Sequence, residues 1–197
     1  DTEILVEEVL KELHDGMRVL DMCTGSGCIL LSLLHYSNAC EGLGVDLSAD
    51  ALEVAEQNAE TLLDAVNADR VHFLQSDLFD KVEGKFEIIV SNPPYIASAE
   101  VEKLMPEVRD HEPRMALDGT EDGLHFYRRI IEEAGKHLVS SGMLFFEIGY
   151  DQGQAVSELM RTEGYREGQV VQDYAGLDRV VFGTYVTVQP APFAKSR

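Results

Sequence analysis

Asp21-Met22-Cys23-Thr24-Gly25-Ser26-Gly27 follows a short β-rich run, 17–22, and precedes an apolar helical run that extends to about His35. A strand, a glycine turn and a helix in this order are typical of a sheet that binds a ligand at the carboxyl ends of its strands. Gly25 and Gly27 lack the Cβ atoms that would block a ligand, and they permit a sharp turn into the helix. Short glycine motifs are weak evidence alone, so the rest of the chain has to support this interpretation.

Strand-like and helix-like segments alternate along the rest of the chain. Strands are expected at 17–22, 42–46, 71–74, 87–91, 143–148, 169–173 and 179–188. Helices are expected at 4–13, 28–35, 49–63, 124–138 and 152–163, with a loop and a short helix within 97–123. Strands separated by helices predict an α/β fold with a doubly wound, mostly parallel, seven-stranded sheet. The last two strands have no helix between them, so at least one of them should run antiparallel.

The composition indicates one acidic globular domain. The chain has 197 residues with 16 Lys+Arg and 36 Asp+Glu, which gives a net charge of −20. We expect a domain over residues 1–188 and a tail at 189–197. There is no apolar run of membrane-spanning length and no secretory signal, and the three cysteines lack C-x-x-C spacing. A cytoplasmic protein without a metal site is therefore expected, and its acidity disfavours nucleic acid as a partner.

Two acidic residues follow strands at positions that suit a nucleoside. Asp46 closes the second strand and could accept both hydroxyls of a ribose, although a turn or helix-capping role is the alternative. Asp77 and Leu78 follow the third strand, where the carboxylate could accept from an adenine amine while the leucine packs on the ring; a turn role is equally compatible with Asp77. Leu30 stands where the dinucleotide fingerprint requires a small residue. The turn at Gly25 instead suits a smaller ligand with a carboxylate and an ammonium group.

Ser91-Asn92-Pro93-Pro94-Tyr95 directly follows the fourth strand. A rigid loop exit is the alternative interpretation. A residue before proline is held out of the helical region, so Asn92 can be fixed at the mouth of a cleft. Its side-chain oxygen and the Pro93 carbonyl are two acceptors, and Pro94 has no N–H to crowd that face. Two acceptors can hold an –NH2 group by its hydrogens and orient its nitrogen toward an electrophile, beside the apolar wall and hydroxyl of Tyr95.

These motifs carry a resemblance to a known family. DMCTGSG, GVDLS, QSDLF and SNPPYI, in this order, resemble the class I S-adenosylmethionine-dependent methyltransferases that act on planar amino groups. Further segments are similar to the HemK/PrmC family: Glu112-Pro113 with Ala116-Leu117, Asp118–Leu124, Tyr127-Arg128, Phe146–Gly149 with Gln152-Gly153, and Asp173 with Gly176–Arg179. That family methylates the glutamine amide in the Gly-Gly-Gln motif of peptide chain release factors.

This sequence departs from the family pattern in three places. Cys23 stands where the family usually has glycine, and Thr120 where a second glycine is common. Asp1-Thr2-Glu3 resembles the end of an Arg-Pro-(Asp/Glu)-Thr-Glu element, whose preceding helical domain is absent from this sequence. We therefore expect a catalytic fragment.

The resemblance implies S-adenosylmethionine as cofactor, S-adenosylhomocysteine as product and a release factor as protein partner, with no membrane or nucleic-acid contact and a monomer favoured. The implied cofactor-binding residues are Asp21, Cys23, Thr24, Gly25, Ser26, Gly27, Asp46, Asp77, Leu78 and Asn92. The implied catalytic residues, which would hold the glutamine amide, are Asn92, Pro93, Pro94 and Tyr95. No general base is needed, so His111, His125 and His137 are expected to be surface or packing residues, and Glu112 is expected to be structural.

Three other functions remain open from the sequence. The same Asn-Pro-Pro-Tyr motif suits the exocyclic amine of adenine in RNA or DNA, which would require a basic track that we do not find. The core motifs do not exclude a glutamine in a ribosomal protein. A non-catalytic S-adenosylmethionine-binding module is disfavoured because the acceptor motif is intact.

Overall fold

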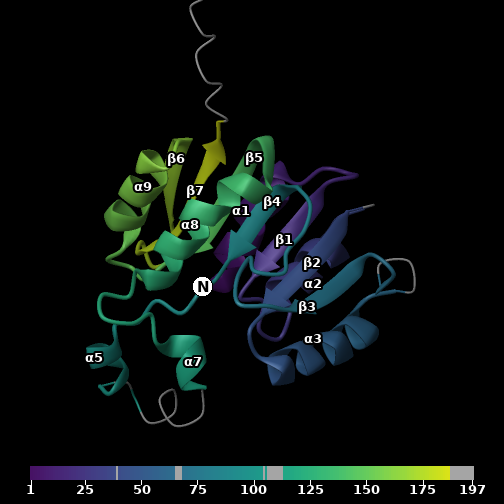
Figure 1. Cartoon of the computed structure of the whole chain (residues 1–197), viewed down its shortest axis with the longest axis horizontal. Helices are drawn as coiled ribbons and strands as arrows, with labels where there is room; N and C mark the ends of the chain where they lie inside the picture. Colours follow the sequence, from purple (N-terminus) through teal and green to yellow (C-terminus); the bar gives the residue numbers. More distant parts are fainter. Residues whose placement is uncertain (39, 65–67, 104, 106–112, 187–197) are drawn as a thin grey trace, which may run out of the picture.

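The computed structural model describes residues 1–38, 40–64, 68–103, 105 and 113–186. Seven strands form one sheet in the order β3-β2-β1-β4-β5-β7-β6 (Figure 1). The strands are β1 Arg18–Met22, β2 Glu41–Asp46, β3 Val71–Gln75, β4 Phe86–Ser91, β5 Leu138–Glu147, β6 Tyr165–Gln172 and β7 Asp178–Tyr185. The described helices are α1 Thr2–Glu12, α2 Cys28–Tyr36, α3 Ala49–Leu62, α5 Ser98–Val101, α7 Arg114–Leu117, α8 His125–His137 and α9 Gly153–Thr162.

The strand directions agree with the pattern expected from the sequence. The pairs β1–β2, β1–β4, β2–β3 and β4–β5 are parallel. The last strand, β7, lies between β5 and β6 and runs antiparallel to both. The chain order reverses at β1, which has β2 on one side and β4 on the other. A crevice at the carboxyl ends of the strands beside such a reversal is the usual ligand site in open α/β sheets.

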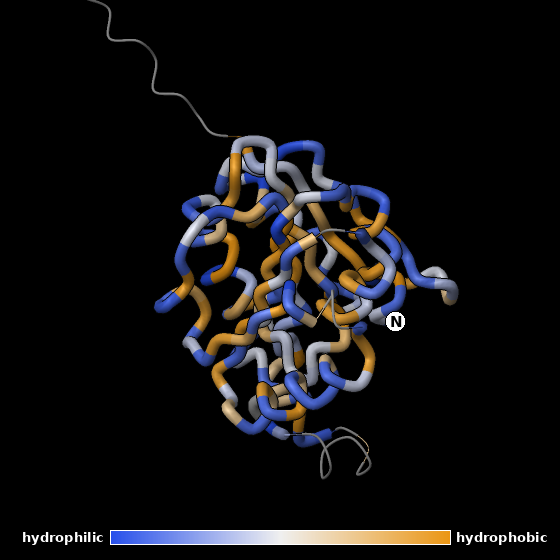
Figure 2. The backbone as a smooth tube through the Cα atoms, turned by 90° about the vertical axis from the view of Figure 1, so that its right-hand side faces the viewer, coloured by the Kyte–Doolittle hydropathy of each residue, from blue (hydrophilic) through white to orange (hydrophobic). Residues whose placement is uncertain are grey.

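Helices cover both faces of the sheet, as alternating strand residues require. Leu20 and Met22 of β1 belong to one core cluster, which also holds the buried residues of α8 and α9. Val19 of the same strand belongs to the other cluster, with the buried residues of α1 and α2. Successive strand residues point to opposite faces, so one short strand contributes to both cores. Figure 2 shows the hydrophobic stretches gathered inside the molecule.

Two strands begin earlier than the sequence indicates. β5 begins at Leu138, directly after α8, because the chain pairs with β4 before a left-handed residue, Ser141, with a φ of 63°. β6 begins at Tyr165 instead of 169, and its register shifts around Glu167, which has a φ of 57°. Polar residues on this exposed edge strand give no alternating pattern, so the sequence could not locate its start.

β7 ends at Tyr185, and Val186 is described outside the strand, so the expected end at 188 was wrong. The expected tail at 189–197 lies outside the described residues. Within the described part of the chain, no helix combines the length and apolarity needed to cross a bilayer.

Candidate active site

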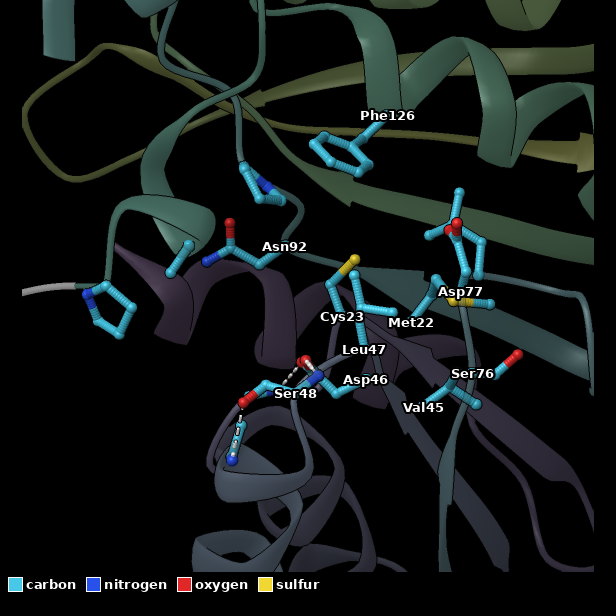
Figure 3. A pocket seen from close by; sticks show the side chains of 16 residues that line it. Met22, Cys23, Val45, Asp46, Leu47, Ser48, Ser76, Asp77, Asn92 and Phe126 are labelled. Atoms are coloured by element: carbon cyan, nitrogen blue, oxygen red, sulfur yellow. Dashed lines mark hydrogen bonds between the residues drawn. The ribbon is translucent and has the colours of Figure 1, made fainter.

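Two adjoining clefts lie at the carboxyl ends of β1, β2 and β4. The first cleft is lined by Met22, Cys23, Gly25, Val45, Asp46, Leu47, Ser48, Ala51, Ser76, Asp77, Leu78, Asn92, Pro94, Pro113, Ala116 and Phe126 (Figure 3). The second cleft is lined by Cys23, Thr24, Gly25, Ser26, Cys28, Ile29, Asn92, Pro93, Tyr95, Ile96, Ala116 and Leu117. Cys23, Gly25, Asn92 and Ala116 line both, so a ligand in one cleft would meet a ligand in the other at these residues.

The glycine turn is built by backbone hydrogen bonds. The Thr24 N–H donates to the Val45 carbonyl at 3.0 Å, and the Gly27 N–H donates to the Thr24 carbonyl at 2.9 Å. Gly25 and Gly27 have φ values of 55° and 79°, in the left-handed region that favours glycine. A Cβ on Gly25 would meet nothing within 4 Å, so this turn leaves open space toward the clefts. Cys23 has a φ of 62°, which explains why glycine is usual at its position.

Asp46 ties the turn to the end of β2. Its Oδ2 accepts from the Gly25 N–H at 2.9 Å, and its Oδ1 accepts from the Ser48 N–H at 2.9 Å (Figure 3). A carboxylate oxygen has two acceptor sites, so both oxygens of Asp46 can still accept from a ligand in the first cleft. The side chain therefore has the turn role that the sequence left as one alternative, and it lines the first cleft, as the ligand-binding alternative requires.

Asp21 lies beneath the turn and lines neither cleft. Its side chain is fully buried, and its Oδ2 accepts from Thr24 Oγ1 at 2.6 Å and from the Leu30 N–H at 3.3 Å. Its Oδ1 is buried without a hydrogen-bond partner among the described residues. Burial raises the pKa of Asp21 to about 7, against the hydrogen bonds from Thr24 and Leu30, while the charge of Asp46 raises it further. Gly27 also lines neither cleft; its Cβ would lie 3.2 Å from Ala55 Cβ on α3.

Asp77 and Leu78 line the first cleft on its β3 side. Asp77 Oδ1 forms an ion pair with Arg129 Nη1 of α8 at 2.9 Å, which the sequence did not indicate. Leu78 is buried and has a φ of 46°, which turns the chain sharply after β3. The two residues therefore occupy the expected place, with one oxygen of Asp77 already paired.

Phe126 of α8 forms part of the wall and was missed by the sequence reasoning. Its ring lies across the first cleft from Ser48 (Figure 3). The residues of α8 that face the core begin with Tyr127 and continue at helical spacing. Phe126 is half-buried at the edge of that stripe and packs against the same core, so the sequence pattern gave no separate signal for a role in binding.

The four predicted catalytic residues lie where the clefts meet. Asn92 lines both clefts. Pro93 and Tyr95 line the second cleft, and Pro94 lines the first. Burial raises the pKa of the Tyr95 hydroxyl. The structure thus brings the Asn-Pro-Pro-Tyr loop to the glycine turn, as the sequence predicts.

Asn92 contacts a buried carboxylate at the end of the neighbouring strand. Glu147, the last residue of β5, is 4% exposed, and burial raises its pKa while hydrogen bonds from Thr2 and Asn92 oppose the rise. The Glu147 Oε2 atom is buried and has no hydrogen-bond partner among the described residues.

The Asp118–Leu124 segment supports the acceptor loop from behind. The Ile96 N–H donates to the Leu117 carbonyl at 3.1 Å, and the Gly119 N–H donates to the Ile96 carbonyl at 2.8 Å. A Cβ on Gly119 would lie 2.8 Å from the Pro94 carbonyl oxygen. Thr120, the second departure from the family pattern, has a φ of 72°. Glycine is favoured in this segment because the two backbones pack directly against each other.

His125 and His137 line neither cleft, in agreement with their expected surface or packing roles. His125 is exposed, and His137 stacks on Phe79 with ring centroids 4.8 Å apart. His111 and Glu112 lie outside the described residues. Among the residues that the structure places, no group of three or more His, Cys, Asp or Glu side chains could hold a metal ion.

Comparisons with known proteins agree with this architecture. The family model described as methyltransferase small domain matches residues 1–108. The release factor glutamine methyltransferase of Thermodesulfovibrio yellowstonii is 43% identical over 186 residues, which cover 92% of this chain and 65% of that protein. The chain therefore spans slightly less than two thirds of that relative.

Two solved structures are also similar. The release-factor-specific protein-(glutamine-N5) methyltransferase of Alicyclobacillus acidocaldarius is 31% identical, with 94% of this chain and 91% of that chain covered and a TM-score of 0.54. The RNA methyltransferase of Salinibacter ruber, solved in complex with S-adenosyl-L-homocysteine, is 16% identical, with 98% and 97% covered and a TM-score of 0.60. At that identity the second likeness shows the fold alone.

Proposed function

The chain belongs to the methyltransferase small domain family, and from this premise we propose that it methylates the side-chain amide of the glutamine in the Gly-Gly-Gln motif of a peptide chain release factor. Its fold is that of the class I methyltransferases. The observation that carries the proposal is the position of Asn92, at the junction of the two clefts. One cleft would hold the methyl donor and the other the acceptor glutamine.

The first cleft fits S-adenosylmethionine. Asp46 would accept from the ribose hydroxyls, and Asp77, Leu78 and Phe126 would surround the adenine. The turn at 23–27 would lie along the methionine part, where Gly25 leaves open space. The bound cofactor supplies a methyl group on a positively charged sulfur, and the acceptor nitrogen releases its proton to water afterwards.

The acceptor loop would act by orientation. An amide nitrogen is a poor nucleophile because its lone pair is delocalised into the carbonyl group. The Asn92 side-chain oxygen and the Pro93 carbonyl would accept from the two amide hydrogens, which draws electron density to the nitrogen and aligns it with the donor. No step requires a general base, and neither cleft is lined by a described His or Lys.

The lining of the clefts favours a protein acceptor over a nucleic acid. No Arg or Lys is among the described residues that line either cleft, so a phosphate backbone would meet no cationic partner there. A glutamine side chain needs only a narrow apolar channel with two acceptors at its end. Tyr95, Ile96 and Leu117 would form the walls of that channel.

The proposal is tested by mass spectrometry of a release factor incubated with the chain and S-adenosylmethionine. We expect one added methyl group, located on the glutamine of Gly-Gly-Gln. The Asn92→Ala variant should lower turnover about 10²-fold and leave cofactor affinity within a few-fold, because it removes positioning. Gln57→Ala, which removes an exposed amide from α3, is the matched control. Methylation of RNA or of a ribosomal protein in parallel reactions, without release-factor methylation, would refute the assignment.

A further inference from the structure

Gln152 joins the acceptor loop to three other segments through one side-chain amide. Its Nε2 donates to the Tyr95 carbonyl at 3.0 Å and approaches the Gly123 carbonyl at 3.4 Å. Its Oε1 accepts from the Gly149 N–H at 3.0 Å and lies 3.5 Å from the Tyr127 hydroxyl. The residue precedes α9, directly after the turn that follows β5. It lines neither cleft, so it can act on substrates only through its neighbours.

The Tyr95 carbonyl is closely confined. A Cβ on Gly123 would overlap its oxygen, which shows how tightly the Asp118–Leu124 segment packs behind the loop. Gln152 Nε2 is the donor that the structure shows for this oxygen. A buried carbonyl that loses its donor costs about 1–3 kcal/mol, so the loop would shift to find another partner. Such a shift would move Asn92 and Pro93, because they are only three and two residues away, respectively.

The Oε1 side of the amide fixes Gln152 itself. The Gly149 N–H donates to this oxygen, and a Cβ on Gly149 would lie 3.0 Å from it. The Tyr127 hydroxyl, which approaches the same oxygen, donates at 2.9 Å to the Glu147 carbonyl and is fully buried. The –NH2 group is thereby directed toward Tyr95. The orientation of the acceptor loop is consequently set by the end of β5 and by α8.

We propose that Gln152 is a positioning residue for methyl transfer, which holds the Asn92–Tyr95 loop at its working distance from the donor through the Tyr95 carbonyl. The proposal rests on the proposed function and explains how a proline-rich loop without internal hydrogen bonds keeps two acceptors in place. A misplacement of about 1 Å in such a site is worth about 10² in rate. The effect should therefore appear in turnover and leave cofactor binding unchanged.

The test compares Gln152→Glu and Gln152→Ala with Gln154→Glu. Gln152→Glu keeps the size of the side chain and the acceptor for Gly149, but it replaces the donor to Tyr95 with an oxygen. Gln154 is exposed on the same helix, so its variant makes the same change of charge without those contacts. For both Gln152 variants we expect kcat to fall about tenfold or more, with the KM for release factor and the Kd for S-adenosylmethionine within about threefold. The control should match the unsubstituted chain.

Hydrogen exchange provides a readout that needs no activity. The Ile96 N–H donates to the Leu117 carbonyl, and the Gly119 N–H donates to the Ile96 carbonyl, so both amides join the residue after the loop to the segment behind it. Their exchange rates therefore report how firmly the loop is held. We expect faster exchange at both amides in the Gln152 variants and no change in Gln154→Glu.

The outcomes separate the two proposals. Unchanged exchange at both amides, a kcat within twofold of the control, or an equal loss of cofactor affinity and turnover would each overturn the positioning role. If the unsubstituted chain methylates no release factor, the proposed function fails, and the exchange data alone decide whether Gln152 holds the loop.

Discussion

The free energy of unfolding should fall as the pH rises because of Asp21, and replacing Asp21 with asparagine should abolish this contribution. Burial raises the pKa of Asp21 from 3.8 to about 7 in the folded chain. Between those two values the folded chain holds a proton that the unfolded chain has lost. The free energy of unfolding therefore falls with rising pH across this window and is constant above a pH of about 7. Each unit of raised pKa corresponds to about 1.4 kcal/mol, so the full effect is about 4 kcal/mol.

The accessible part of the window is large enough to measure. Between pH values of about 5.5 and 7, the contribution of Asp21 should fall by about 2 kcal/mol. In Asp21→Asn, the amide oxygen can accept from Thr24 and Leu30, and no charge develops. The –NH2 group would occupy the place of the unpartnered Oδ1 and lack an acceptor, which costs about 1–3 kcal/mol at every pH.

The assay is urea unfolding of both chains from a pH of about 5.5 to about 8.5. The quantity of interest is the free energy of unfolding of the unsubstituted chain minus that of Asp21→Asn. Contributions from Glu147 and other titrating groups are present in both chains and cancel in the difference. We expect the difference to fall by about 2 kcal/mol and then level off. Asp50→Asn, on the exposed first turn of α3, carries the same change without burial. A difference that is flat or rises with pH would refute the buried-carboxyl argument.

Three further predictions follow from the clefts and their supporting loops. Asp46→Ala should weaken S-adenosylmethionine binding about tenfold or more in calorimetry, because it removes the proposed acceptor for the ribose hydroxyls and the acceptor for the Gly25 N–H. The control Asp50→Ala should bind S-adenosylmethionine as the unsubstituted chain does. Phe126→Ala should weaken the same binding about tenfold by removing an aromatic wall, with unfolding monitored to show that the fold persists; equal affinity would exclude the ring from the site. Thr120→Gly should raise the free energy of unfolding in urea by about 1 kcal/mol, because a β-branched residue is strained at a φ of 72°, and an unchanged midpoint would contradict that strain.

The sequence predicted the sheet and the main site motifs because both depend on local pattern. The turn at Gly25, Asp46 and the Asn92 loop each follow a strand directly, and parallel strands bring their carboxyl ends to one edge. Strand and helix periods therefore sufficed to place these motifs together. Sequence reasoning also predicted that the last strand runs antiparallel, because no helix precedes it.

The remaining features depend on tertiary contacts that local pattern does not encode. Phe126 reaches the cleft because α8 packs across the sheet, and Arg129 of the same helix reaches Asp77 for the same reason. Asp21 is buried because β1 is a central strand covered on both faces, so its expected ligand-binding role could not be distinguished from a role beneath the turn. Gln152 belongs to a segment that carries the family resemblance, but the sequence indicated no role for it, and its importance appears only when its four partners are seen around it.

The charges around Cys23 bear on which ligand the turn favours. Burial raises the pKa of the Cys23 thiol to about 12, and the charges of Asp46, Asp21 and Asp77 raise it further. The thiol therefore stays protonated at neutral pH and is a poor nucleophile, although it lies at the junction of the clefts. Of the three acidic residues, Asp77 is paired with Arg129 and Asp21 holds its proton below a pH of about 7, so the negative charge at this junction comes mainly from Asp46. In the proposed reaction the donor carries a positive sulfur and the product does not, so this negative charge would favour the donor over the product.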